Sequence, residues 1–243
     1  MGIKAQRKKT PVNSADIILY SSIVIGALLL IALVKKEQGE WLKLFLFWGM
    51  VIPTVFTTLY LAAATVMENQ SSATGGPVHW HADFQIYSCG NAVKLREPSG
   101  LSNRIGKTLL HEHGDSRVHV EGAVQDLNDV SLSEFFESIG GQLANSFLIL
   151  PTDNGTFRMQ NNMDCPDGSK PVLQIFAYKT NEQTKTITQE KLIDFPGYIL
   201  SPAGKVPPGD CLIIEFGPAK AKTEHICGFY QIAINNGDYT YQQ

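Results

Sequence analysis

Two long apolar runs near the N-terminus constrain this chain more than any other feature. Residues 17–34 (IILYSSIVIGALLLIALV) and 44–67 (LFLFWGMVIPTVFTTLYLAAATVM) contain no charged residue. As helices they would extend about 27 Å and about 36 Å, and a bilayer's hydrocarbon core is about 30 Å thick. We therefore predict a membrane anchor over residues 1–67 with two transmembrane helices, which makes the lipid bilayer a partner.

The alternatives to two spans are signal-like segments that are cleaved. The first run is longer than the usual hydrophobic stretch of a signal peptide, and no small-x-small site follows it directly. A cut in the second run near Ala62–Ala64 stays open. We favour two spans, and therefore a multi-pass protein of the cell membrane.

The orientation of the anchor rests on the residues after the second run. The N-terminal tail carries four Lys/Arg and the loop between the runs carries three, so the positive-inside rule decides little. Residues 68–93 contain no Lys or Arg, and sequons begin at Asn69 and Asn154. Both features favour an extracytoplasmic C-terminal domain.

Residues 68–76 (ENQSSATGG) form a polar linker by composition, and residues 77–243 are long enough for one hydrophobic core. Residues 78–88 alternate between apolar and polar side chains, which is typical of a half-buried strand. Further strands are expected at 93–95, 109–113, 117–124, 147–150, 156–159, 172–178, 184–189 and 212–216. A Ser131–Glu134 capping box predicts a short helix over 131–139, and a C-terminal helix is expected over 219–234. The fold class is therefore α+β, with a mostly antiparallel or mixed sheet.

The charge of the C-terminal domain excludes one class of partner. Residues 68–243 hold thirteen Lys/Arg and twenty Asp/Glu, a balance of −7. Binding to phosphate backbones requires clustered basic residues. We therefore expect no nucleic-acid partner.

Five of the six histidines lie between residues 79 and 119. His79 and His81 share one strand face, because residues two apart in a strand point the same way, and His111 and His113 do the same. A three-residue loop at 114–116 would place His111 opposite His119. If the strand over 78–88 pairs beside this hairpin, all five imidazoles converge.

A neutral imidazole is the commonest side-chain ligand for copper and zinc. The histidine cluster, which consists of His79, His81, His111, His113 and His119, is therefore a candidate metal site with copper or zinc as the cofactor. Nearby carboxylates are either further ligands or groups that fix the histidine tautomers; they are Asp83, Glu112, Asp115 and Glu121. A metal-free polar network and unrelated surface histidines are the alternatives.

The leading functional hypothesis is a membrane-tethered domain that binds a transition metal for handling or delivery. A second hypothesis is a metal-dependent enzyme in which Glu112 or Glu121 serves as the general base. A third is a non-catalytic surface or interaction protein whose histidines form a metal-free network. The sequence does not decide whether the protein is an enzyme.

All four cysteines, Cys89, Cys165, Cys211 and Cys227, lie in the C-terminal domain. An even number in a translocated domain predicts two disulfides, for which three connectivities exist. Four separate thiols are expected if the domain is cytoplasmic. A thiol–disulfide oxidoreductase is a further alternative, against which the absence of a Cys-x-x-Cys motif argues.

The stretches GPVHWHADFQIYSCG (76–90) and LLHEHGDSRVHVEG (109–122), followed by SLSEFF and VPPGDCLIIEFG, resemble an uncharacterised family of membrane-anchored, histidine-rich proteins of archaea and candidate-phyla bacteria. The resemblance covers most of residues 76–230, and the two histidine stretches are its specific part. It implies a membrane-tethered histidine-rich domain without a particular activity. Such proteins are sometimes labelled disulfide-isomerase-like, and this chain departs from that label because it lacks Cys-x-x-Cys.

Overall fold

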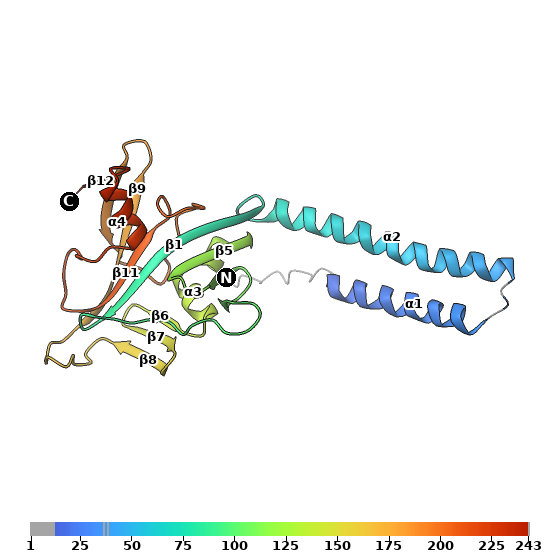
Figure 1. Cartoon of the computed structure of the whole chain (residues 1–243), viewed down its shortest axis with the longest axis horizontal. Helices are drawn as coiled ribbons and strands as arrows, with labels where there is room; N and C mark the ends of the chain where they lie inside the picture. The colour runs from blue at the N-terminus through green and yellow to red at the C-terminus, as the bar shows by residue number, and fades with distance from the viewer. Residues whose placement is uncertain (1–12, 36, 38, 243) are drawn as a thin grey trace, which may run out of the picture. The chain divides into compact units, whose positions relative to one another are not determined.

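The computed structural model describes residues 13–35, 37 and 39–242 (Figure 1). The chain divides into two compact units with a boundary between Gln70 and Ser71. The first unit contains two long apolar helices, and the second is a mixed β-sheet domain with short helices.

The first unit consists of α1 (Ser14–Val34) and α2 (Glu40–Ser71). Asn13 caps α1 by accepting a hydrogen bond from the backbone N–H of Ala15 at 3.1 Å. The hydroxyls of Ser21 and Thr57 join the two helices at 2.7 Å. Both helices are long and apolar enough to cross a bilayer. Of the most apolar stretch of each helix, 6% is buried inside the protein.

Helix α2 continues into the segment that the composition assigned to a linker. Residues 68–71 are helical, because Gly75 is the first residue after the apolar run that interrupts a helix readily. The next turn is closed by a hydrogen bond from the Gly76 N–H to the Ser72 hydroxyl at 2.9 Å. Strand β1 then begins at Pro77.

The second unit is built on one large sheet with strand order β12-β10-β9-β11-β1-β5-β4-β3, and β2 also pairs with β1. The pairs β1–β11 and β10–β12 are parallel, and the other pairs of this sheet are antiparallel. Its strands are β1 (Pro77–Ser88), β2 (Asn91–Ala92), β3 (Ile105–Gly106), β4 (Leu110–Glu112), β5 (Arg117–Ala123), β9 (Val172–Asn181), β10 (Thr186–Lys191), β11 (Cys211–Gly217) and β12 (Thr240–Gln242). A smaller antiparallel sheet contains β6 (Gln142–Ala144), β7 (Phe147–Thr152) and β8 (Gly155–Gln160).

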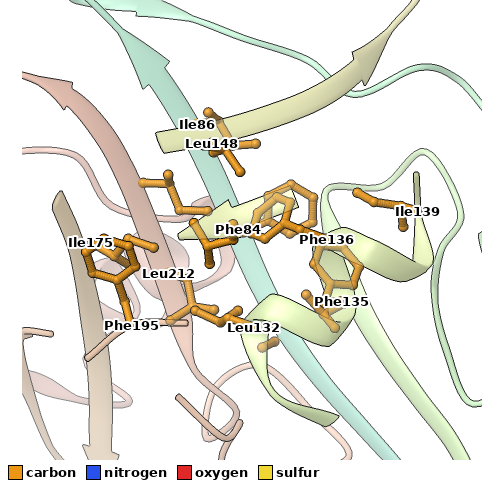
Figure 2. Close-up of a cluster of buried hydrophobic side chains, with 14 of the residues drawn as sticks. Phe84, Ile86, Leu132, Phe135, Phe136, Ile139, Leu148, Ile175, Phe195 and Leu212 are labelled. Atoms are coloured by element: carbon orange, nitrogen blue, oxygen red, sulfur yellow. The ribbon is translucent and has the colours of Figure 1, made fainter. Parts of the chain in front are cut away.

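One face of the large sheet packs against α3 (Leu132–Ser138) and the smaller sheet. A 3₁₀ turn at Leu127–Val130 precedes α3 in the chain. Phe84 from β1 and Leu212 from β11 meet Phe135 from α3 in this core (Figure 2). The ring centroids of Phe84 and Phe135 lie 5.6 Å apart. As the capping box predicts, the Ser131 hydroxyl accepts from the Glu134 N–H at the start of α3.

The opposite face carries a second core beneath α4 (Gly228–Asn235). Phe176 and Tyr178 from β9 pack there with Ile213 from β11 and Tyr230 from α4. Strand alternation places the odd-numbered residues of β1 on this same face. The predicted histidine face of β1 therefore continues into the side of the sheet that α4 covers.

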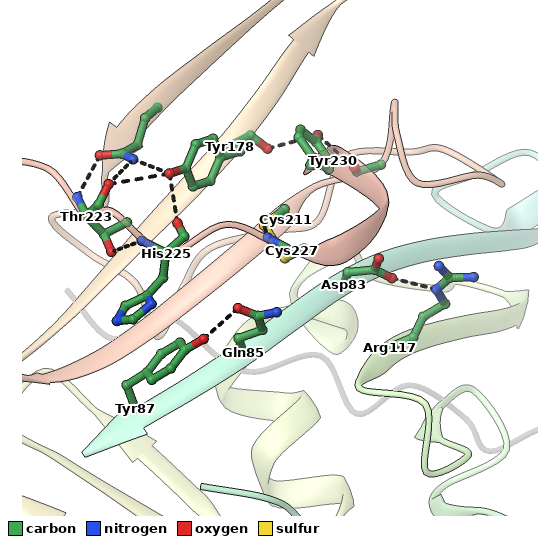
Figure 3. Close-up of a disulfide and its surroundings, with 12 residues drawn as sticks. Asp83, Gln85, Tyr87, Arg117, Tyr178, Cys211, Thr223, His225, Cys227 and Tyr230 are labelled. Atoms are coloured by element: carbon green, nitrogen blue, oxygen red, sulfur yellow. Dashed lines mark hydrogen bonds and ion pairs between the residues drawn. A yellow bond between two sulfur atoms is a disulfide. The ribbon is translucent and has the colours of Figure 1, made fainter. Parts of the chain in front are cut away.

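Two disulfides close the domain, Cys89–Cys165 and Cys211–Cys227. The sequence left three connectivities open, and the structure has this one. Cys227 is the residue before α4, so its bond to Cys211 ties the start of that helix to β11 (Figure 3).

The C-terminal helix predicted over 219–234 is wrong in its first half. The helix begins at Gly228, because the preceding segment is fixed in a non-helical conformation by tertiary contacts. The side-chain amide of Gln189 donates to the Thr223 carbonyl and accepts from the Thr223 N–H, and Cys227 is held by its disulfide.

Most other strand predictions match within three residues at each end, with four exceptions. Residues 93–95 are not a strand, since the pairing with β1 occurs at Asn91–Ala92. Strands β3, β6 and β12 were not predicted, because strands of two or three residues carry too little periodicity to be recognised.

Candidate metal centre

The histidine cluster lies on three adjacent strands, β1, β5 and β4. His119 is the register partner of His81 on one side and of His111 on the other. The predicted pairing of His111 with His119 across the hairpin is therefore confirmed. His79 precedes His81 by two positions and is paired with Glu121, and His113 directly follows β4.

The imidazole ring of His119 lies at the centre of the cluster. Its centroid is 4.7 Å from that of His81 and 4.8 Å from that of His113, and it stacks on His111 at 5.4 Å with an interplanar angle of 8°. The potential ligand atoms form two overlapping triads, in each of which they lie within 4.8 Å of one another. The triads are His79–His81–His119 and His111–His113–His119.

Backbone carbonyls fix the tautomers of three rings in the cluster. The Nδ1 of His111 lies 3.2 Å from the Thr108 carbonyl, and the Nδ1 of His113 lies 2.6 Å from the Asn103 carbonyl. A carbonyl oxygen only accepts hydrogen bonds, so each Nδ1 carries the proton and donates it. In the neutral rings the Nε2 atoms then hold lone pairs, and these two atoms face each other at 3.1 Å.

The pair on β1 has the same pattern. The Nδ1 of His81 donates to the Gly204 carbonyl at 2.9 Å, which leaves a lone pair on its Nε2. That atom lies 2.8 Å from the Nε2 of His79. The loop that contributes Gly204 is held against β1, since the His81 N–H donates to the Ala203 carbonyl.

Asp115, in the hairpin loop, sets the tautomer of His119. The Nε2 of His119 lies 3.2 Å from a carboxylate oxygen of Asp115 and donates to it. The lone pair is then on Nδ1, which is buried and has no hydrogen-bond partner among the described residues. An unpaired buried acceptor is costly unless a ligand occupies it.

Burial keeps the central rings in the form that binds metals. Burial lowers the pKa of His119 to about 4, against the opposing effect of the Asp115 carboxylate. Burial also lowers the pKa of His81 and of His111. A histidine ligates as the neutral imidazole, so these pKa shifts favour coordination at neutral pH.

Two of the four candidate carboxylates reach the cluster. Asp115 contacts His119, and Glu121 lies between two other rings. One Glu121 oxygen is 3.4 Å from His79 Nε2, and the other is 3.9 Å from His111 Nε2.

The other two carboxylates have different partners. Asp83 forms a 2.6 Å ion pair with Arg117 (Figure 3). The Arg117 guanidinium also lies 5.0 Å from the ring centre of Phe229 in α4. Glu112 points to the opposite side of β4 and accepts from the Ser116 N–H at 3.0 Å. It borders a cavity of about 240 Å³ whose lining includes Phe84 and none of the five histidines. Burial raises the pKa of both carboxyls.

The carbonyl oxygens of Asn103, Thr108 and Gly204 are site atoms that the sequence reasoning did not find. Every residue has a backbone carbonyl, so no residue type marks these positions. A weak signal exists at Asn103, which adopts a positive φ of 46°, a conformation that asparagine tolerates well.

The cysteines are not available as ligands, because all four are in disulfides. The donor set of the cluster is therefore imidazole nitrogen with one adjacent carboxylate. Comparison with known proteins yields no matching family model, no matching curated protein and no matching solved structure.

Proposed function

We propose that this protein is a membrane-tethered, extracytoplasmic domain that binds copper or zinc through its histidine cluster, for handling or delivery of the metal. The proposal combines three features of the chain: the cluster, the apolar helices and the disulfides. The cluster supports the metal, and the helices and disulfides support the location.

The observation that carries the metal proposal is the contact between His111 and His113. With each Nδ1 donating its proton to a carbonyl, two neutral rings place their Nε2 lone pairs opposite each other at 3.1 Å. That arrangement is repulsive in a metal-free site and favourable around a cation. Hydrogen bonds from the second nitrogen to carbonyls are also the usual means by which proteins orient histidine ligands.

The donor set supports copper or zinc over harder cations. Calcium and magnesium prefer oxygen ligands, whereas imidazole suits zinc and copper. Tetrahedral ligands about 2.0–2.1 Å from zinc lie roughly 3.3 Å apart, which is close to the 3.1 Å between the Nε2 atoms of His111 and His113. His119 supplies a third nitrogen from the next strand.

The proposed location rests on the helices and disulfides. Large apolar side chains along α1 and α2 are not covered by other parts of the protein; the side chains of Leu33 and Leu59, for example, are 77% and 65% exposed. Such a surface is stable in hydrocarbon and unfavourable in water. Disulfides form and persist in oxidising compartments, which supports an extracytoplasmic domain.

Elemental analysis of the full-length protein in detergent tests the metal proposal. After loading with zinc or copper and dialysis, the wild type should retain metal, His119→Ala should lose most of it because both triads share this ring, and His113→Ala should retain less than the wild type. His225→Ala is the matched control, because His225 lies outside the cluster and stacks on Tyr87. Equal, sub-stoichiometric metal in the wild type and all three variants would leave only the metal-free network.

Membrane orientation is tested independently in intact cells. Protease added outside should cleave the C-terminal domain, whose described loops include the exposed tip at residues 181–185. Protection of the domain in intact cells, with cleavage after lysis, would place it in the cytoplasm and overturn the extracytoplasmic part of the proposal.

A further inference from the structure

The histidine cluster contains more ligand atoms than one ion takes in the observed arrangement. The five rings form two triads that share His119, rather than a single group of five. His119 has one lone pair to offer, on Nδ1, because its Nε2 donates to Asp115. An ion that binds this nitrogen together with His111 and His113 leaves His79 and His81 without a metal, and an ion bound with His79 and His81 leaves the other two rings without one.

The two pairs differ in their exposure to solvent. The side chains of His111 and His119 are 1% and 11% exposed, so the triad with His113 is an inner position. The side chain of His79 is 60% exposed, so the pair with His81 is an outer position. An ion in the outer position would exchange with solvent more readily.

Glu121 reaches both positions. It is the register partner of His79, and its side chain points to the same face of the sheet. Its two oxygens are divided between the pairs, one at 3.4 Å from His79 Nε2 and the other at 3.9 Å from His111 Nε2. A carboxylate that gives one oxygen to each of two ions is typical of centres whose metals are about 3.5–4 Å apart.

The outer pair has ligand geometry of its own. The Nε2 atoms of His79 and His81 are 2.8 Å apart, and the Glu121 oxygen is 3.4 Å from the former. Both distances approach the roughly 3.3 Å between neighbouring ligands of tetrahedral zinc. The Gly204 carbonyl holds the His81 proton on Nδ1, which leaves Nε2 as the atom that can bind a metal.

From these contacts we propose that the cluster holds two metal ions, an inner one on His111, His113 and His119 and an exchangeable outer one on His79 and His81, bridged by the Glu121 carboxylate. This inference rests on the proposed metal-binding function. The outer ion faces solvent and is the one delivered or received. The inner ion stays resident.

Zinc content and release from the full-length protein in detergent test the two positions. The wild type should retain two zinc ions per chain and release them to a chelator in two phases, with rates that differ by about tenfold or more. His79→Ala should keep one ion and lose the fast phase. His113→Ala should lose the slow phase, and His225→Ala should behave as the wild type.

Glu121→Gln tests the bridge. Loss of one carboxylate oxygen as an anionic ligand should remove the outer ion and leave one slowly released zinc. With copper(II) in place of zinc, the wild type should show a spin count below its copper content, since bridged ions couple magnetically. The Gln variant should show a spin count equal to its copper content.

The outcomes separate this inference from the proposed function. One zinc per wild-type chain, released in a single phase and unchanged in His79→Ala, overturns the second position and leaves the proposed function standing. Two ions with wild-type release in Glu121→Gln overturn the bridge. Retention of no zinc by the wild type overturns the proposed function itself.

Discussion

His111 and His113 direct their Nε2 atoms at one another over 3.1 Å, although a backbone carbonyl holds the proton of each ring on Nδ1. Side chains two apart in a strand point to the same face, and these two rings converge there as the rings of His79 and His81 do within β1. The convergence of two lone pairs is what distinguishes this cluster from polar surface.

We expect Asp115→Asn to weaken zinc binding by about 10–100-fold, the usual effect of removing a carboxylate that orients a ligating histidine. The neutral amide accepts less strongly from His119 Nε2 and can also donate to it, which would move the ring proton onto Nδ1. A competition titration against a chromophoric chelator measures the affinity. Asp167→Asn is the control, because the exposed Asp167 carboxylate accepts hydrogen bonds from Ser169 and lies outside the cluster. Equal affinities in the two variants would contradict the role of Asp115 in orienting His119.

The metal-free domain should lose stability on mild acidification. The pKa of His119 is about 4 in the folded protein and about 6.5 in an unfolded chain, so between these values the unfolded state binds a proton that the folded state does not. Acidification from pH 7 to pH 4 should therefore cost on the order of 3 kcal/mol at this residue. Denaturant unfolding with a chelator present, at several pH values, measures the effect. His119→Gln should show a shallower dependence, and an identical slope would refute the prediction.

Both disulfides should contribute to stability, and the longer loop should contribute more. Residue separations of 76 and 16 correspond to about 4.5 and about 3 kcal/mol of loop entropy, respectively. We expect Cys89→Ala with Cys165→Ala to lower the unfolding midpoint more than Cys211→Ala with Cys227→Ala. Urea denaturation followed by the circular dichroism of the β-sheet provides the comparison. The reverse order would mean that packing of the fully buried Cys211 dominates over loop entropy.

Gly209→Ala should destabilise the domain and disturb the outer histidines. A Cβ at Gly209 would collide with the backbone carbonyl of His81 and would lie 2.9 Å from that of Lys205. Overpacking of this kind costs about 1–3 kcal/mol, and each kcal/mol lowers the melting temperature of a domain this size by about 2–4 °C. Gly217→Ala, where a Cβ meets nothing within 4 Å, is the control for a thermal melt. Equal melting temperatures would contradict the close approach.

The local part of the site can be predicted from the sequence. The period of two in residues 78–88 predicts the phase of His79 and His81, and the Gly114–Ser116 loop predicts the register that places His111 beside His119. Both features depend on residues that are close together in the chain, so the local sequence is enough to predict them.

The remaining parts depend on tertiary contacts. Nothing in the sequence indicates that the Gly204 carbonyl lies beside His81, because a loop 123 residues downstream supplies it. The true start of α4 depends likewise on the Cys211–Cys227 bond and on Gln189, neither of which alters the apolar period of the helix. The division of the carboxylates, with Glu121 near the rings and Asp83 paired to Arg117, was also not determined by their positions in the sequence.

The hairpin of β4 and β5 brings His111, His113 and His119 together with Asp115 in its own loop. Contacts within this hairpin close quickly and at little entropic cost. His79 and His81 join the cluster only when β1 pairs with β5, and the chain segment between these two strands is much longer than the hairpin loop. We therefore expect the half of the cluster on the hairpin to form earlier in folding than the half on β1. If the cluster binds metal as proposed, the hairpin triad would be the part able to take up an ion before the sheet is complete.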